Sequence, residues 1–214
     1  MRQLSTIVLL IFTVLALNTM PSYSAIKGKI NYSIPIDLSK LSETELKDKA
    51  DDYYFLAKQA KEIDENVTNA LFLYSVLSDK NPENIRYCMR LGILYDKFGI
   101  DRHAKGNFSK AISINSSLPD PYFYLGEFYY KRESYRKALK YYNEAFKKGF
   151  NNYDILYRIG DIYEKFGDTR SALKYLNDAN SKNPNPELSN KIKRIEAQDA
   201  SNKEYYSNTR IRIR

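Results

Sequence analysis

The chain has 214 residues, 43% of them hydrophobic, with 20 tyrosines, no tryptophan, 8 glycines and 7 prolines. This is enough apolar material for one or two domains, and so little glycine and proline argues against a loop-rich all-β fold and favours helices. The net charge is +8, but residues 191–214 alone carry seven Lys or Arg against three Asp or Glu. The remainder is nearly balanced and lacks the clustered basic patch of a nucleic-acid-binding protein.

Residues 1–24 have the three-part pattern of a secretory signal peptide. Arg2 supplies the positive charge, an apolar run ends at Leu17, and a polar, turn-prone stretch follows. The apolar run is shorter than the roughly 20 residues that span a membrane. We therefore expect an exported protein, periplasmic or extracellular, cleaved after Ser24 or Ala25. Retention as an uncleaved anchor is the alternative.

Residues 25–40 are expected to form an extended lead-in, and a helix is expected to begin after Ser42. Ser42 and Glu45 have the spacing of a capping box, in which each side chain bonds the other residue's backbone N–H. Residues 41–84 then read as a worn version of a pattern that becomes clear further along the chain.

That pattern is a period of 34 residues. The stretches RLGILYDKFG from Arg90, YLGEFYYKRE from Tyr124 and RIGDIYEKFG from Arg158 align without a gap. The aligned positions place a glycine, a tyrosine, an alanine, a large residue and a second alanine in each unit: Gly92, Gly126 and Gly160; Tyr95, Tyr129 and Tyr163; Ala104, Ala138 and Ala172; Phe108, Tyr142 and Leu176; Ala111, Ala145 and Ala179.

Each of the three glycines lies within an apolar helical pattern, where glycine costs about 1 kcal/mol relative to alanine. Close packing of two helices explains this choice, because a Cβ at the contact would hold the helices apart. The period and the small and large positions together resemble the tetratricopeptide repeat (TPR). The resemblance implies an all-α solenoid of antiparallel helix pairs, with repeats at residues 85–118, 119–152 and 153–186, a degenerate first repeat at 41–84 and a capping helix at 187–202.

The TPR resemblance also implies a function. Such arrays bind a peptide or a helix of a protein partner in a concave groove lined by the first helix of each pair. Carried onto this chain, the groove positions are Met89, Arg90, Ile93, Asp96 and Lys97 in the first clear unit, Phe123, Tyr124, Glu127, Tyr130 and Lys131 in the second, and Tyr157, Arg158, Asp161, Glu164 and Lys165 in the third.

Two features of the groove positions invite separate interpretation. Lys97, Lys131 and Lys165 repeat every 34 residues, so they either form a ladder along one edge or simply solvate helix ends. The groove aromatics Phe123, Tyr124, Tyr130 and Tyr157 are expected to be available to a partner, because packing between repeats does not demand them.

The basic tail covers residues 203–214, and its end, residues 207–214, is expected to be disordered when free. Its arginines, Arg210, Arg212 and Arg214, alternate with apolar residues and suit weak contact with an anionic surface, addition as a strand to a partner, or a frayed, solvated end.

No catalytic, metal or cofactor motif stands out in the sequence. One cysteine and one histidine are too few for a metal-ligand cluster. We expect Cys88 to be buried and His103 to be exposed at the start of a helix. Asp161 and Glu164 share a helical face, which is more typical of a solvated surface than of acid–base catalysis. The sequence therefore predicts a non-enzymatic adaptor in a bacterial envelope. The alternatives are a protein that binds lipid or wall polymer through its tail, and an accessory subunit of an envelope enzyme.

Overall fold

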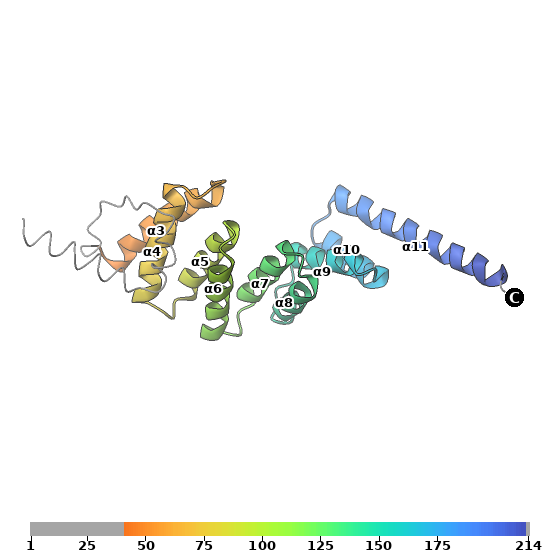
Figure 1. Cartoon of the computed structure of the whole chain (residues 1–214). Coiled ribbons are helices and arrows are strands. Elements are labelled where there is room, and N and C mark those ends of the chain that lie inside the picture. The colour runs from red at the N-terminus through yellow and green to blue at the C-terminus, as the bar shows by residue number, and fades with distance from the viewer. Residues whose placement is uncertain (1–40, 213–214) are drawn as a thin grey trace, which may run out of the picture. The chain divides into compact units, whose positions relative to one another are not determined.

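The computed structural model describes the backbone of residues 41–212 and the side chains of residues 41–205. All regular secondary structure in this part of the chain is helical, as expected (Figure 1). The predicted signal peptide, the predicted lead-in and Arg214 lie outside the described residues, and so do the side chains of Arg210 and Arg212. No helix in the described part is both long enough and apolar enough to cross a membrane.

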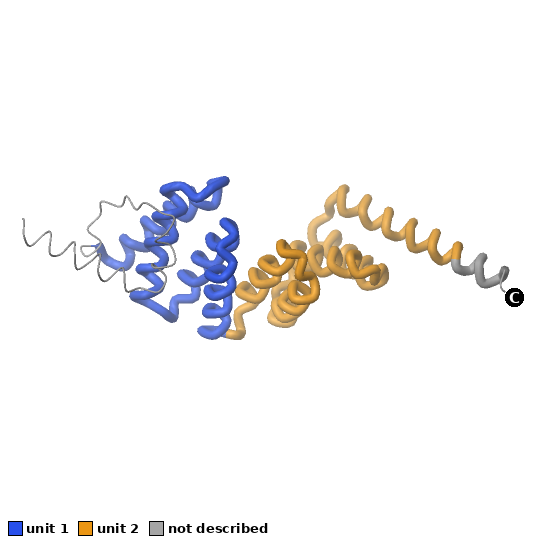
Figure 2. The backbone as a smooth tube through the Cα atoms, in the orientation of Figure 1, with its two compact units in different colours: residues 1–115 blue, residues 116–214 orange. Residues whose placement is uncertain are grey.

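The chain divides into two compact units after residue 115 (Figure 2). The described part of unit 1 holds two helix pairs: α3 (Glu43–Gln59) with α4 (Glu65–Lys80), and α5 (Ile85–Lys97) with α6 (Asp101–Ile114). Helices α4 and α5 join the two pairs, and α3 also touches α5. We call the first helix of each pair the A helix and the second the B helix.

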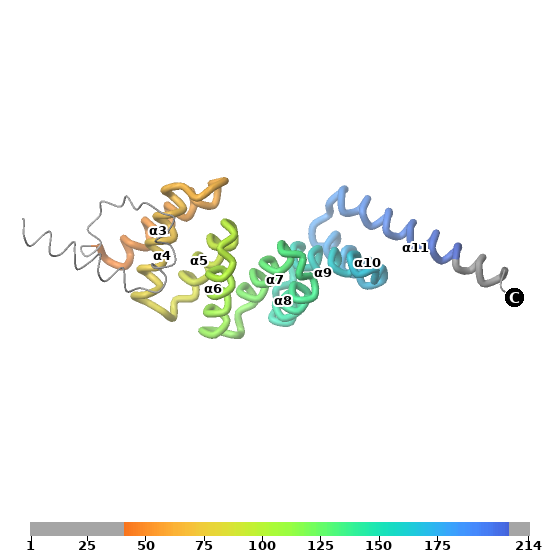
Figure 3. The backbone as a smooth tube through the Cα atoms, in the orientation of Figure 1, coloured from red at the N-terminus to blue at the C-terminus, as the bar shows by residue number. Residues whose placement is uncertain are grey.

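Unit 2 holds two further pairs and a long final helix. The pairs are α7 (Asp120–Lys131) with α8 (Tyr135–Lys147), and α9 (Tyr153–Lys165) with α10 (Thr169–Lys182), followed by α11 (Pro186–Arg212). Helix α8 packs on α9, and α10 packs on α11 (Figure 3). The core is built from the predicted small and large positions, with Ala138, Tyr142 and Leu176 fully buried.

Polar residues cap several helix starts. Ser42 and Glu45 make both bonds of the capping box, with Ser42 N–H donating to Glu45 Oε2 at 2.8 Å. Asp64 and Asn152 accept backbone N–H groups at the starts of α4 and α9. Such side chains satisfy amides that have no partner within the helix.

The mid-helix glycines are explained by a large side chain of the B helix. A Cβ built on Gly92 would lie 2.5 Å from Cε1 of Phe108, and one built on Gly160 would lie 2.8 Å from Cγ of Leu176. At Gly126 the ring of Tyr142 occupies the same place. The packing reason predicted from the sequence is therefore confirmed, and the contacting group is the large residue 16 positions later.

The turn inside each clear repeat uses a left-handed backbone conformation at one aligned position. Gly99 and Gly167 have φ angles of 71° and 76°, and the aligned residue of the middle repeat, Glu133, has φ 54°. This region is accessible to glycine but costs a residue with a Cβ about 1–2 kcal/mol.

Helix α11 continues ten residues beyond the expected end at residue 202. Pro186 begins the helix, and the side chain of Asn185 accepts from the backbone N–H of Glu187 at 2.8 Å. Leu188, Ile192 and Ile195 are buried, as a capping helix requires. No Gly or Pro follows Pro186, and Lys203 pairs with Asp199 one turn earlier, so the sequence supplies no stop signal. The tail expected to be disordered is helical as far as Arg212.

Candidate protein-interaction surfaces

The A helices of unit 1 are joined by contacts one repeat apart. Arg86 on α5 pairs with Asp51 on α3 at 3.1 Å, and the guanidinium of Arg90 lies 4.1 Å from the ring centroid of Tyr54. Lys97 Nζ donates to the backbone carbonyl of Lys58 at 2.5 Å. These contacts fix α3 beside α5, and we call the side of these two helices that carries the predicted groove positions the A surface of unit 1.

An exposed phenylalanine lies on this A surface. Phe55 is 66% exposed, and it shares a helical face with Asp51 and Lys58, the two α3 residues that reach α5. Met89 and Ile93, one turn apart on α5, are half-buried. The groove positions predicted from the sequence did not include Phe55. Aligning Ala57 with Gly92 gives Phe55 the same repeat position as Arg90.

The remaining groove positions of unit 1 are only partly available to a partner. Arg90 is half-buried over the Tyr54 ring, and Asp96 is also half-buried. Lys97 is exposed, but its ammonium is held on α3. Lys131 and Lys165 lie in unit 2, so the structure does not establish the predicted ladder of three lysines.

In unit 2 two charged groove positions, Glu127 and Arg158, are paired across the A helices. Arg158 on α9 donates from Nε to Glu127 Oε1 on α7 at 2.7 Å and from Nη2 to Oε2 at 3.1 Å. The Tyr142 hydroxyl donates to the same carboxylate at 2.5 Å. Burial is the largest single influence on Arg158 and would lower its pKa, but the hydrogen bonds and the charge of Glu127, together with the nearby tyrosines, raise this pKa above its ordinary value. Burial, reinforced by the nearby Glu127 charge, raises the pKa of Tyr142.

A second cluster surrounds Asp161, which is only 7% exposed. Its carboxylate accepts from Lys191 Nζ on α11 at 2.7 Å and from the Tyr130 hydroxyl at 2.5 Å, and Lys165 Nζ lies 3.7 Å away. Burial would raise the pKa of Asp161, but the hydrogen bonds from Lys191 and Tyr130 hold it below its ordinary value. The same cluster fixes the start of α11 against α9.

Lys191 also links Asp161 to its neighbour on α9, Glu164. Lys191 Nζ lies 2.7 Å from Glu164 Oε2, and Arg194 approaches the other oxygen at 3.4 Å. The Lys191 ammonium lies 5.1 Å from the ring centroid of Tyr157. Asp161 and Glu164 are thus paired with cations from α11. The expectation that they form a solvated surface is wrong for Asp161, which is buried, and Glu164 is half-buried.

The four groove aromatics expected to be available to a partner are all half-buried, so each exposes only part of its surface. Phe123 stacks on Phe150 at 4.5 Å, Tyr130 lies under the Arg158 guanidinium at 4.4 Å, and Tyr157 stacks on Tyr153 at 5.9 Å. All three pack against the buried core of unit 2, whereas Tyr124 is half-buried outside that cluster. Lys131 is exposed at the end of α7. The contact of Tyr130 with Arg158 joins two repeats, whereas Phe123 packs within its own repeat and Tyr157 stacks within α9.

The described residues provide no evident centre for chemistry. They contain no group of three or more His, Cys, Asp or Glu side chains placed to hold a metal ion. Cys88 is buried, as predicted. His103 lies at the start of α6, as predicted, but it is half-buried instead of exposed, with its Nδ1 buried and its ring 5.1 Å from that of Tyr95. The side chains on the A helices are arranged to contact other side chains and to hold neighbouring helices in place.

Comparison with known proteins identifies the architecture. Residues 154–186 match the family model of the tetratricopeptide repeat. No curated protein sequence matches the chain. Among solved structures, the chain resembles the MamA protein with a TM-score of 0.56 and 18% identity over 66% of this chain and 73% of that one.

Two further solved structures show the same fold. YrrB, described as a TPR protein with an unusual peptide-binding site, has a TM-score of 0.56 and 24% identity over 63% of this chain and 70% of that one. PilW, described as a type IV pilus biogenesis factor, has a TM-score of 0.56 and 16% identity over 65% and 62%. The chain thus carries a tetratricopeptide repeat at residues 154–186 and has the fold of the tetratricopeptide-repeat proteins.

Proposed function

We propose that this chain is a non-catalytic scaffold that binds a peptide or a helix of a protein partner on the A surface of unit 1. The tetratricopeptide-repeat fold is a scaffold for protein–protein interaction, and its stacked A helices commonly form the binding face. The observation that supports unit 1 is the exposure of Phe55, because a large aromatic left in water on such a face is typical of a binding hot spot.

The surroundings of Phe55 favour an apolar anchor on the partner. Met89 and Ile93 add half-buried apolar area on the neighbouring helix α5. Arg90 and Lys97 are already held by α3, so they contribute fixed positive charge without a further loss of side-chain freedom. We infer that the partner segment inserts an apolar side chain beside Phe55 and carries a carboxylate nearby.

We assign a structural role to the charged side chains on the A helices of unit 2. Binding a charged partner at Glu127, Arg158 or Asp161 would require breaking existing ion pairs, and removing one partner of such a pair is costly.

We further propose that the scaffold acts in the bacterial cell envelope after export. The support is the order of basic, apolar and small polar residues over residues 1–24. The proposal for the binding surface does not depend on this location.

Peptide selection tests the binding surface directly. A phage-displayed library of random peptides is selected on the full chain, and the affinity of enriched peptides is measured by fluorescence anisotropy. Phe55→Ala is expected to weaken binding about 30-fold, the loss typical of a hot-spot residue. Phe166→Ala is the matched control, because Phe166 is also an exposed aromatic, at 45%, but lies in unit 2. Failure to enrich any peptide, or equal affinity for the wild type and Phe55→Ala, would refute the proposed surface.

A further inference from the structure

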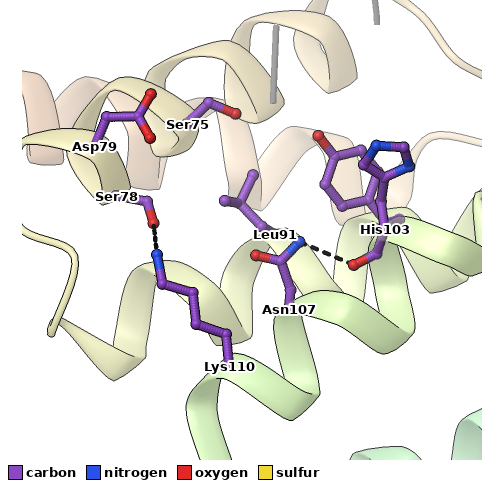
Figure 4. A pocket seen from close by; sticks show the side chains of 8 residues that line it. Ser75, Ser78, Asp79, Leu91, His103, Asn107 and Lys110 are labelled. Carbon is purple, nitrogen blue, oxygen red and sulfur yellow. Dashed lines mark hydrogen bonds between the residues drawn. The ribbon is translucent and has the colours of Figure 1, made fainter. Parts of the chain in front are cut away.

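Unit 1 contains a polar pocket of about 160 Å³ lined by side chains of α4, α5 and α6 (Figure 4). Leu91 and Tyr95 on α5 are buried and line its base, Ser75 contributes from α4, and His103 and Asn107 contribute from α6. Asp79 is exposed and Lys110 is half-buried, so the pocket is open to solvent where these two residues lie.

The pocket exists because one repeat departs from the 34-residue pattern. At the positions aligned with Asn107, the next two repeats carry Tyr141 and Tyr175. These rings stack on Tyr129 and Tyr163 of their own A helices, with centroids 5.4 and 5.7 Å apart. In the first clear repeat the shorter Asn107 does not fill this space, and its Nδ2 instead donates to the His103 carbonyl at 2.9 Å.

Two polar atoms of the pocket are buried without a hydrogen-bond partner among the described residues. Ser75 is only 5% exposed and its Oγ is unpaired, and Nδ1 of His103 is also unpaired. An unsatisfied buried polar atom costs about 1–3 kcal/mol, so these atoms require water or a bound polar molecule.

The pocket is lined by two side chains of opposite charge, Asp79 and Lys110. Lys110 Nζ donates to Ser78 Oγ at 3.2 Å (Figure 4), and its charge acts on Asp79. Asp79 is exposed as a residue, but the partial burial of its carboxylate raises its pKa, and the Lys110 charge opposes this rise. A ligand with a net charge of either sign therefore meets a like charge, whereas a neutral ligand does not.

We propose that this pocket binds a single neutral, hydroxyl-rich ring, the size of one sugar unit. Each sugar hydroxyl both donates and accepts, so it satisfies Ser75 Oγ and His103 Nδ1 whichever tautomer the imidazole adopts. Leu91 and Tyr95 provide the apolar base against which the C–H face of the ring packs. A closed cavity of about 150 Å³ holds a benzene-sized ring, and the larger ring of a sugar fits here only because the pocket is open to solvent, so that some of its hydroxyls stay in water. This site lies on other residues than the peptide surface and does not depend on it.

A titration of the full chain tests the proposal. Glucose, galactose and N-acetylglucosamine are each added to ¹⁵N-labelled protein, with glycine as a zwitterionic comparison. At least one sugar is expected to shift the backbone amide signals of Ser75, His103 and Asn107 in a saturable manner, and glycine is not. The proposal is overturned if none of the sugars shifts these signals, which would mean that the pocket holds only water, or if glycine alone shifts them.

Two variants locate the binding. Asn107→Tyr introduces the residue of the other two repeats and is expected to abolish sugar binding while the affinity for a selected peptide stays unchanged. Ser75→Ala removes only the hydroxyl oxygen, and is expected to weaken sugar binding about tenfold. Circular dichroism confirms folding, and Ser75→Ala decides the test if Asn107→Tyr does not fold. Wild-type sugar affinity in the folded variants would overturn the proposal.

Discussion

Arg158 and Glu127 form a two-pronged ion pair between the A helices of consecutive repeats. Both hydrogen bonds are short, at 2.7 and 3.1 Å, and the two side chains are only 32% and 16% exposed. Both residues stand at positions that line a ligand groove in related arrays. In unit 2 they hold α7 and α9 together, so the charges at these positions are structural.

Removing the carboxylate of this pair should destabilise unit 2. Glu127→Ala leaves the half-buried Arg158 guanidinium and the Tyr142 hydroxyl without their acceptor, and we expect a loss of about 1–3 kcal/mol in the free energy of unfolding. Lys147→Ala is the control, because its pair with Glu144 is exposed and is worth less than about 1 kcal/mol. Urea unfolding measures both, and equal losses would contradict the structural role of the pair.

The cluster at Asp161 predicts a loss of stability in acid. The folded pKa of Asp161 lies below its ordinary value of 3.8, so the folded state binds the proton less readily than the unfolded chain. Its contribution is therefore fully present above pH 3.8 and disappears as the pH falls through the lower, folded pKa. Asp161→Asn should be less stable than the wild type near neutral pH, and the difference in melting temperature should shrink towards pH 2. A difference independent of pH would show that Asp161 is not ionised in the folded protein.

The titration of Lys191, the partner of Asp161, sets the highest pH at which the stability difference between the wild type and Asp161→Asn persists. Burial would lower the pKa of Lys191, but hydrogen bonds with Asp161 and Glu164 raise it above its ordinary value of 10.5. The contribution of Lys191 is fully present below that ordinary value and is lost only as the pH rises through the higher, folded pKa. The deficit of Asp161→Asn should therefore stay constant from about pH 5 to pH 10.

A double-mutant cycle tests the close approach at Gly92. The three atoms nearest to the Cβ of Gly92→Ala would be ring atoms of Phe108, at 2.5 to 3.1 Å, so the substitution should cost about 1–3 kcal/mol despite the better helix propensity of alanine. Phe108→Ala should cost about 3–5 kcal/mol. The double variant should lose less than the sum of the two, and strict additivity in urea unfolding would refute the contact.

The turn at Glu133 should be improved by glycine. Glu133 has φ 54°, whereas the aligned turns place Gly99 and Gly167 in that region. Glu133→Gly should raise the free energy of unfolding by about 0.5–1 kcal/mol, because relief of backbone strain exceeds the added freedom of the unfolded chain. Glu133→Ala keeps the Cβ and should bring no such gain. If alanine stabilises as much as glycine, the side chain and not the backbone is responsible.

Export predicts a specific mature N-terminus. Sequencing the native protein should find Ala25 or Ile26 as the first residue, because small residues precede both bonds in the turn-prone stretch that follows the apolar run. Recovery of Met1 from a cytosolic fraction would contradict the proposed location and leave the binding surface of unit 1 unaffected.

The sequence by itself determined the helical repeat. A period of 34 residues repeats Gly92, Gly126 and Gly160 with Phe108, Tyr142 and Leu176, and these positions alone predict which helices pair and where they touch. Such local information suffices because the two helices of a pair are close in sequence, so their small and large positions must match within one repeat. Local sequence also predicted the capping box at Ser42, from its spacing to Glu45, and the burial of Cys88.

Only the tertiary structure decided which groove positions are used for packing and which are open. Glu127 and Asp161 receive their partners from residues about 30 positions later, and Lys191 comes from a helix outside the regular period. The exposure of Phe55 and the pocket beside His103 likewise depend on what neighbouring helices leave uncovered. A repeat pattern specifies the contacts within each repeat. The surface left for a ligand is set by packing between neighbouring helices, because a charged or aromatic side chain is covered only when a neighbour supplies a group that contacts it.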